Sequence, residues 1–247
     1  MRKYIWILSL TLVLGLGLSA FAQENAAPGK TPKSTVLIFR EDFKANKGEV
    51  QLTRDAATNP SVELKVYGPG SKPGKGNESG LLLSNEEDTV HPGKMESYIF
   101  TGVVEASWGV MLKDKNNYMD LRDTARVIWR TRARSLHELR LLVKLADGTM
   151  WASDYTERLS TYMHESEVFF GDILRWRQIN PETMEEARAK PGEPLWKTNL
   201  DLSRVDEIGF SDLMAGAGHG TQGNVSVDWI EVYGNPVKRN VSTSQAR

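Results

Sequence analysis

The feature that most constrains the fold of this chain is a series of short segments rich in β-branched and aromatic residues and separated by turn signals. About a dozen such segments are expected to be strands, near 35–43, 49–53, 61–67, 80–84, 95–104, 107–113, 125–134, 138–146, 149–155, 172–179, 206–213 and 224–233. Several alternate apolar and polar residues, which places successive side chains on opposite faces of a sheet. Strands do not alternate with long helices. The pattern predicts an all-β fold, an antiparallel β-sandwich of the jelly-roll type.

Two consecutive segments carry the clearest alternation. In the first, one face is expected to hold Val127, Trp129, Thr131 and Ala133 and the other Arg126, Ile128, Arg130, Arg132 and Arg134. In the second, Leu139, Leu141, Val143 and Leu145 oppose Arg140, Leu142 and Lys144. We expect two neighbouring strands with an apolar inner row and a basic outer row. Trp129 is expected in the core, and so is Trp229, which strict alternation places on one face with Val225 and Val227.

One short helix is expected as a surface insertion at 181–190. Asn180 suits its N-cap, Pro181 its first turn and Glu182 the positive end of the helix dipole. Pro191-Gly192 would end it.

The N-terminus indicates export. Arg2 and Lys3 precede an apolar run that ends near Leu18, and Ala20-Phe21-Ala22 follows. We expect a signal peptide at 1–22, cleaved after Ala22; the alternative is an uncleaved anchor. Residues 23–34 are expected to be a flexible leader, 35–236 the sandwich domain and 237–247 a flexible tail. The mature chain is expected to be secreted or periplasmic, with no membrane span after signal cleavage.

Composition excludes several classes of function. The chain has no cysteine, and therefore no disulfide, thiolate metal site or cysteine nucleophile. Lys and Arg number 31 and Asp and Glu 32, so the charge gives no reason to expect nucleic acid as a partner. The sequence also lacks the motifs of serine hydrolases, zinc proteases and phosphate-binding loops.

The C-terminal third of the sequence resembles a known family. Residues 200–210 read Leu-Asp-Leu-Ser-Arg-Val-Asp-Glu-Ile-Gly-Phe, and residues 225–232 read Val-Ser-Val-Asp-Trp-Ile-Glu-Val. This sequence pattern is similar to that at the end of galactose-binding-like jelly rolls, notably family 11 carbohydrate-binding modules. Glu41-Asp42-Phe43 resembles their opening strand, and Trp176-Arg177-Gln178-Ile179 the segment before their last strands. The resemblance implies a galactose-binding-like sandwich with carbohydrate as its ligand.

The same resemblance implies a structural calcium site. In many sandwiches of this group, an acidic residue of the last strand holds the ion together with acidic or carbonyl groups of the first strand. The matching positions here are Asp228 with Glu41 or Asp42. Two carboxylates and backbone carbonyls would supply the oxygen ligands that calcium takes. The alternative is that Asp228 pairs with an arginine or caps loop amides.

A sugar site needs an aromatic ring with polar groups beside it. Trp151 and Tyr155 follow a tight turn and are expected to stack on the sugar, with Trp108 as a second choice to Trp151. Hydrogen bonds to hydroxyl or acidic groups are expected from Arg132, Arg134 and Arg140, because a guanidinium grips a carboxylate or sulfate through two bonds. The alternative is that carboxylates and carbonyls of neighbouring strands satisfy these arginines, or that they face water.

We therefore expect an exported, non-catalytic domain that binds extracellular or periplasmic carbohydrate, with acidic glycans as one ligand class. One alternative is a polysaccharide lyase that uses Tyr162, His164 and Glu165, or a glycoside hydrolase that uses Glu165, Glu167 and Asp172. The other is a structural or protein-docking domain without a small ligand.

Overall fold

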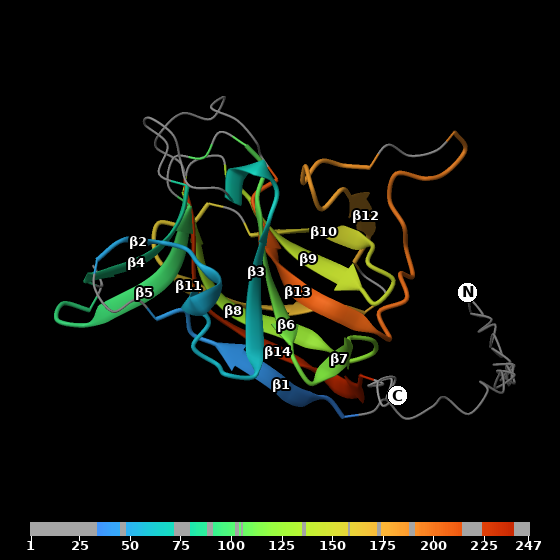
Figure 1. Cartoon of the computed structure of the whole chain (residues 1–247), viewed down its shortest axis with the longest axis horizontal. Helices are drawn as coiled ribbons and strands as arrows, with labels where there is room; N and C mark the ends of the chain where they lie inside the picture. The colour runs from blue at the N-terminus through green and yellow to red at the C-terminus, as the bar shows by residue number, and fades with distance from the viewer. Residues whose placement is uncertain are drawn as a thin grey trace, which may run out of the picture. The chain divides into compact units, whose positions relative to one another are not determined.

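The computed structural model describes residues 34–44, 48–71, 80–87, 91–101, 104, 106–134, 137–157, 159–171, 174–187, 191–213 and 224–239. The expected signal peptide, nearly all of the expected leader and residues 240–247 lie outside this part of the chain. Within it the elements are strands and two short 3-10 turns, with no α-helix, so the all-β prediction is confirmed (Figure 1). No helix in these ranges is long and apolar enough to cross a membrane.

The strands vary from two to fourteen residues in length. In chain order they are β1 (Val36–Glu41), β2 (Val50–Gln51), β3 (Val62–Tyr67), β4 (Leu81–Glu87), β5 (Met95–Thr101), β6 (Gly109–Asp114), β7 (Asn117–Asp120), β8 (Arg126–Ala133), β9 (Leu139–Leu145), β10 (Met150–Glu157), β11 (His164–Phe169), β12 (Trp176–Ile179), β13 (Val205–Ser211) and β14 (Val225–Lys238). The 3-10 turns are η1 (Arg54–Ala56) and η2 (Pro69–Ser71).

The strand pairs are antiparallel and form two sheets that β14 joins. Sheet A contains β11, β8 and the first part of β14; β1 and β5 pair with the other edge of β14, and β4 and β2 follow β5. Sheet B runs in the order β12-β10-β9-β13-β6-β3, with β7 between β13 and the end of β14. β14 continues to Lys238, past the boundary expected at 236.

The two sheets face each other across one apolar core. Sheet A contributes Val127 and Trp129 from β8, and sheet B contributes Ile208 and Phe210 from β13. Phe43 meets Phe210 edge to face, with ring centroids 6.2 Å apart. The inner row predicted for 125–134 is therefore confirmed, and the chain is an antiparallel β-sandwich.

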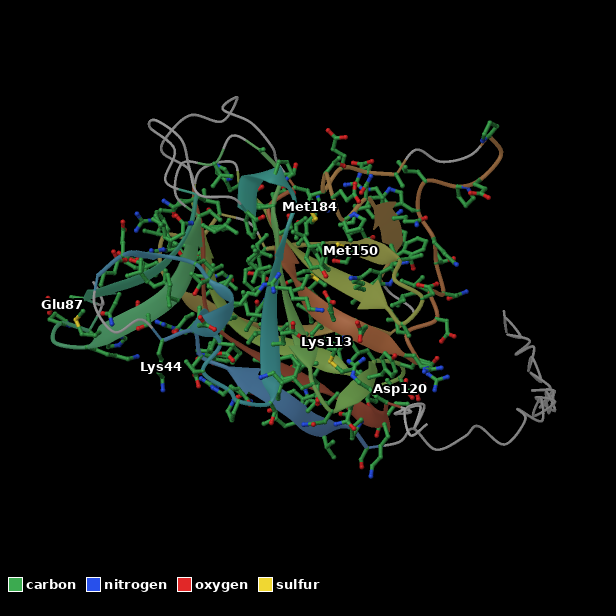
Figure 2. The ribbon with its side chains drawn as sticks, viewed as in Figure 1. Lys44, Glu87, Lys113, Asp120, Met150 and Met184 are labelled. Carbon is green, nitrogen blue, oxygen red and sulfur yellow. The ribbon has the colours of Figure 1, made fainter. Side chains whose placement is uncertain are left out.

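A second, smaller apolar cluster covers part of the outer face of sheet B. Leu142, Met150 and Ile179 belong to it, together with Met184 from the segment after β12. Figure 2 labels Met150 and Met184, which lie close together over this sheet. Sheet B is thus partly buried on both of its faces.

The helix predicted at 181–190 is wrong for 181–187, the part that is described. The chain turns back after β12, and Glu186 forms an isolated bridge with Ile179. Met184 adopts a positive φ of 57° and is almost fully buried. Burying this side chain on sheet B outweighs the local helix signals, because propensity is a weak preference that tertiary packing overrides.

The predicted neighbourhood of 125–134 and 138–146 is also wrong. β8 pairs with β11 and β14 in sheet A, whereas β9 pairs with β10 and β13 in sheet B. The connection between them crosses from one sheet to the other. The expected basic surface is therefore divided between the outer faces of the two sheets.

Candidate functional site

The outer face of sheet A carries a cleft of about 520 Å³. Six strands line it with polar or aromatic side chains: β1 with Arg40, β4 with Asn85, β5 with Glu96 and Ser97, β8 with Arg130, β11 with Glu165, and β14 with Asp228 and Trp229. Asp42, Lys44, Lys94 and Met95 complete the lining. A concave sheet face with an indole among hydrogen-bonding groups is a suitable arrangement for a small polar ligand.

A β-bulge in β14 places two consecutive residues on this face. The pairing of β14 with β8 shifts register between Val227 and Trp229. Val227 and Ile230 point into the core, while Asp228 and Trp229 both line the cleft. A bulge inserts one extra residue into a strand and re-aims the side chains around it. The expectation that Trp229 lies in the core is therefore wrong.

Arg130 holds two carboxylates together in the cleft. Its two terminal nitrogens donate to Asp228 and to Glu96, each at 2.5 Å. All three side chains are largely buried, with at most 18% of each exposed. Burial raises the pKa of the Asp228 carboxyl above its ordinary value, although Arg130 beside it acts in the opposite direction.

A second arginine fixes the ring of Trp229. The guanidinium carbon of Arg40 lies 4.2 Å from the ring centroid, a cation–π contact. Arg40 itself donates to Asp42 (2.9 Å) and to Glu231 (2.7 Å). Because its guanidinium is held by two carboxylates, it restrains the indole in one orientation.

The charges that line the cleft balance. The basic side chains are Arg40, Lys44, Lys94 and Arg130, and the acidic ones are Asp42, Glu96, Glu165 and Asp228. The cleft therefore offers donors and acceptors in similar number, without the excess of positive charge that an acidic ligand needs.

The residues predicted to bind sugar do not share one surface. Trp151 and Tyr155 pack against the core between the sheets. The indole N–H of Trp151 donates to Thr149 (2.9 Å), and the ring of Tyr155 lies against Trp129, with centroids 6.3 Å apart. The hydroxyl of Tyr155 donates to Glu157. Trp108, the second choice, is also buried in the core.

The predicted arginines do not form one group with these rings, because Arg132 and Arg140 belong to different sheets. Arg132 lies on the outer face of sheet A, pairs with Glu86 at 3.3 Å and is 6% exposed. Arg140 lies in β9 of sheet B and pairs with Glu138 at 3.1 Å. Arg134 follows β8 and is exposed. The grouping failed because β8 and β9 belong to different sheets.

The carboxylates proposed for calcium point in different directions. Glu41 is fully buried on the inner side of β1, where its carboxylate accepts the backbone N–H groups of Thr58 (2.7 Å) and Asn59 (3.1 Å). Asp42 and Asp228 are bound by arginines on the outer side. No group of three or more His, Cys, Asp or Glu side chains that could hold a metal occurs in the described ranges. The register of β1 on β14 explains why Glu41 points inward, because Glu41 pairs with Ile230, which faces the core.

The residues considered for catalysis do not all come together, although Glu165 and Glu167 share one face of β11. His164 and Glu165 project from opposite faces of β11, because successive residues of a strand alternate. His164 shares a hydrogen bond with Glu157 of β10 (2.6 Å), and Ser166 donates to the same carboxylate (2.9 Å). Tyr162 is 57% exposed. Asp172 lies outside the described residues.

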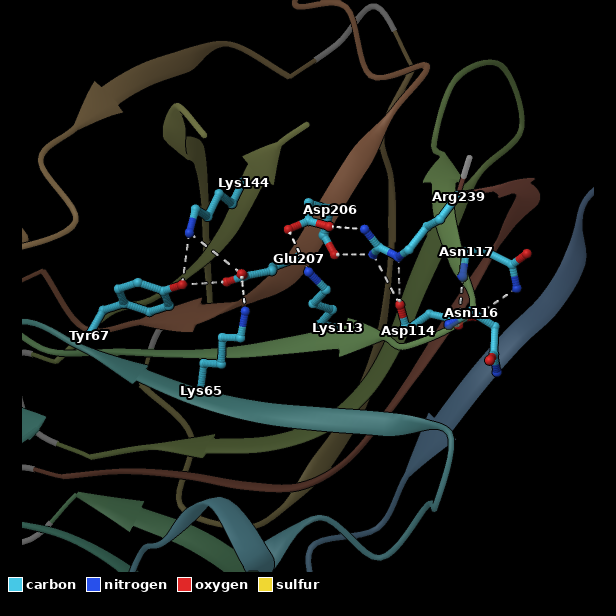
Figure 3. A network of polar contacts seen from close by, with 10 residues as sticks. All are labelled: Lys65, Tyr67, Lys113, Asp114, Asn116, Asn117, Lys144, Asp206, Glu207 and Arg239. Atoms are coloured by element: carbon cyan, nitrogen blue, oxygen red, sulfur yellow. Dashed lines mark hydrogen bonds and ion pairs between the residues drawn. The ribbon is translucent and has the colours of Figure 1, made fainter. Parts of the chain in front are cut away.

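The outer face of sheet B holds a buried polar network whose hydrogen-bond partners are other side chains of the chain (Figure 3). Glu207 is fully buried and accepts hydrogen bonds from Lys65 (2.9 Å) and Tyr67 (2.8 Å). Lys144 donates to the Tyr67 hydroxyl (2.9 Å). Burial and the bond to Glu207 raise the pKa of Tyr67. A buried carboxylate needs such partners, so this network requires no ligand.

No protein-family model matches the sequence, and no curated protein matches it significantly. Among solved structures, the chain is similar to a family 11 carbohydrate-binding module from Clostridium thermocellum in complex with a β-1,3-1,4-mixed-linked tetrasaccharide, with 16% identity over 79% of this chain and 100% of that one, at a TM-score of 0.40. It is also similar to the family 11 module of a cellulosomal cellulase of that organism, with 13% identity over 85% and 99% and a TM-score of 0.39. The laminarinase from Rhodothermus marinus matches with 12% identity over 85% and 100% and a TM-score of 0.36. At these scores the similarities carry no argument about what this chain binds.

Proposed function

We propose that this chain is an exported, non-catalytic carbohydrate-binding domain, and that the cleft on sheet A is its binding site. The observation that supports this most is the position of Trp229, an indole that lines an outer cleft and is held by Arg40 at 4.2 Å. Sugars present an apolar C–H face to an aromatic ring and hydroxyl groups to the polar residues around it. The cleft offers both kinds of contact.

The balance of charge favours a neutral glycan. Arg130 and Arg40 each bind two carboxylates, so neither has an unpaired charge to offer to a uronate or a sulfate. Arg132 and Arg140 also have carboxylate partners. The acidic glycans expected from the sequence are therefore the second ligand class to test.

Affinity electrophoresis against neutral and acidic polysaccharides, followed by titration calorimetry, tests this function. We expect the mature chain to be retained by at least one neutral polysaccharide, without release of reducing ends. Trp229→Ala should weaken binding on the order of tenfold or more, because buried aromatic contacts dominate such sites. Trp196→Ala is a matched control, since Trp196 is also partly exposed and lies 4.9 Å from the guanidinium of Arg177 near sheet B. Binding that survives Trp229→Ala, or no binding to any polysaccharide of the panel, would overturn the proposal.

A further inference from the structure

We infer that the binding surface continues from the cleft along β14 to a second position at Tyr233, so that the ligand is an extended polysaccharide chain and not a short sugar. This inference rests on the proposed function and specifies its ligand. Trp229, Glu231 and Tyr233 alternate along β14, and all three project away from the core. Four residues of a strand span about 13 Å. A single sugar ring is much shorter, so a ligand that touches both aromatic rings contains several linked sugars.

The two aromatic rings are held in the same way. The guanidinium of Arg40 lies 4.2 Å from the ring of Trp229, and that of Arg126 lies 4.2 Å from the ring of Tyr233. Glu231 connects the two positions, because one oxygen accepts from Arg40 (2.7 Å) and the other from the Tyr233 hydroxyl (2.8 Å). The rings are therefore fixed relative to each other before any ligand binds, which reduces the entropy lost on binding.

Exposed apolar side chains flank the second position. Leu37 of β1 pairs with Tyr233, Tyr233 with Arg126 of β8, and Arg126 with Phe169 of β11. Leu37 is 47% exposed and Phe169 48% exposed. A row across four strands thus presents apolar surface to solvent, and exposed apolar patches commonly mark binding sites.

The charges within this row favour a glycan over a protein partner. Arg126 lies between Phe169 and Tyr233 and pairs with Glu167 at 2.7 Å. The centre of a protein–protein interface is depleted of charged residues, and a stable interface needs about 800 Å² of surface from each partner. A sugar chain, in contrast, alternates apolar faces with hydroxyl groups that hydrogen-bond to charged side chains. The row is also continuous with the cleft through Glu231.

Titration calorimetry with oligosaccharides of increasing length tests the inference. The probes are cello-, laminari- and manno-oligosaccharides of two to eight units, together with their parent polysaccharides. We expect the affinity of the native chain to rise with length. Tyr233→Ala should weaken binding of the long probes about tenfold and leave the short ones unchanged, whereas Trp229→Ala should weaken both. Tyr233→Phe keeps the ring and should retain the dependence on length.

Tyr118→Ala is the matched control, because the ring of Tyr118 in β7 is also held by an arginine, with the guanidinium of Arg239 at 4.1 Å, but Tyr118 pairs with Val237, beyond Tyr233 on the side of β14 away from the cleft. It should leave the affinity for every probe unchanged. An affinity that does not rise with length, or a Tyr233→Ala variant that binds long probes normally, would refute the second position. If Trp229→Ala still weakens binding in that case, the proposal that the cleft is the binding site stands. A dimer of the native chain that Tyr233→Ala dissociates, measured by light scattering, would instead make the row a protein interface. No binding of any probe by the native chain would overturn both proposals.

Discussion

Asp228 and Trp229 are consecutive in the chain and line the same cleft. The register shift of β14 between Val227 and Trp229 makes this possible. It places a carboxylate within reach of Arg130 and an indole within reach of Arg40. One inserted residue therefore gives this sheet face both an acidic hydrogen-bond acceptor and an aromatic surface.

Loss of Arg130 should destabilise the fold in a pH-dependent way. Arg130→Met leaves Glu96 and Asp228 together without their shared cation, which we expect to cost about 3 kcal/mol at pH 7. Burial already raises the pKa of Asp228, and removing Arg130 raises it further. A raised carboxyl pKa favours the folded state as the pH falls, so the loss should be smaller at pH 4.5. Urea unfolding at both pH values measures it.

Arg132→Met is the control for this experiment. Arg132 lies on the same face, but its carboxylate partner Glu86 is more distant, at 3.3 Å. The side chain of Glu86 is also 48% exposed. Loss of Arg132 should cost less and depend little on pH. An equal loss for Arg130→Met at pH 7 and pH 4.5 would contradict the argument.

Trp151 should contribute to stability and not to glycan binding. Its ring packs against the inter-sheet core, and its N–H donates to Thr149. Trp151→Ala should therefore lower the free energy of unfolding by about 2 kcal/mol, since part of a large side chain leaves the core. Retention by a polysaccharide at a temperature where the variant is folded should be unchanged. A stable variant that no longer binds would restore Trp151 as a binding residue.

Much of the fold could be predicted from the sequence. Each expected segment overlaps a strand, and the burial of Val127 and Trp129 follows the predicted alternation. Local composition does not report which sheet a strand joins, so β8 and β9 were wrongly expected to be neighbours. Two strands, β7 and β11, lie outside the expected segments, and β11 escapes prediction because it is an edge strand whose Glu165 and Glu167 are exposed. Its pattern contains too few apolar residues to indicate a strand.

The site was less predictable than the fold. Alternation assigns faces correctly only while a strand stays regular, and the bulge before Trp229 reverses the assignment of that residue. The place of Trp151 after a tight turn favours it for stacking on a sugar, but its strand directs the ring toward the core. The alternative that Asp228 pairs with an arginine is confirmed, since Arg130 donates to its carboxylate. The register between neighbouring strands determines which side chains come into contact, and a local sequence motif does not reveal that register.

Gly209 should not tolerate a side chain. A Cβ atom at this position would lie 1.9 Å from the carbonyl oxygen of Val110 in the neighbouring strand. Because that atom belongs to the backbone, it cannot move away cheaply. Gly209→Ala should cost about 3 kcal/mol in urea unfolding. Gly171→Ala is the control, since a Cβ there meets no atom within 4 Å. Similar stability of the two variants would contradict the close approach of β13 and β6.

His137 should stabilise the fold at acid pH and lose this effect at alkaline pH. Its ring hydrogen-bonds to the buried carboxylate of Asp212, and this bond raises the pKa of His137 above its ordinary 6.5. A folded pKa above the unfolded one gives stabilisation that is complete below about pH 6.5 and disappears as the pH rises through the folded value. His137→Gln should therefore cost about 1 to 2 kcal/mol at pH 5.5 and little at pH 9. Asp212→Asn should remove the same pH dependence. The pH dependence of the double variant should equal that of either single variant, because both substitutions remove one and the same interaction. Urea unfolding across this range measures the effect, and a loss for His137→Gln that is equal at both pH values would show that the charge of the imidazole does not contribute.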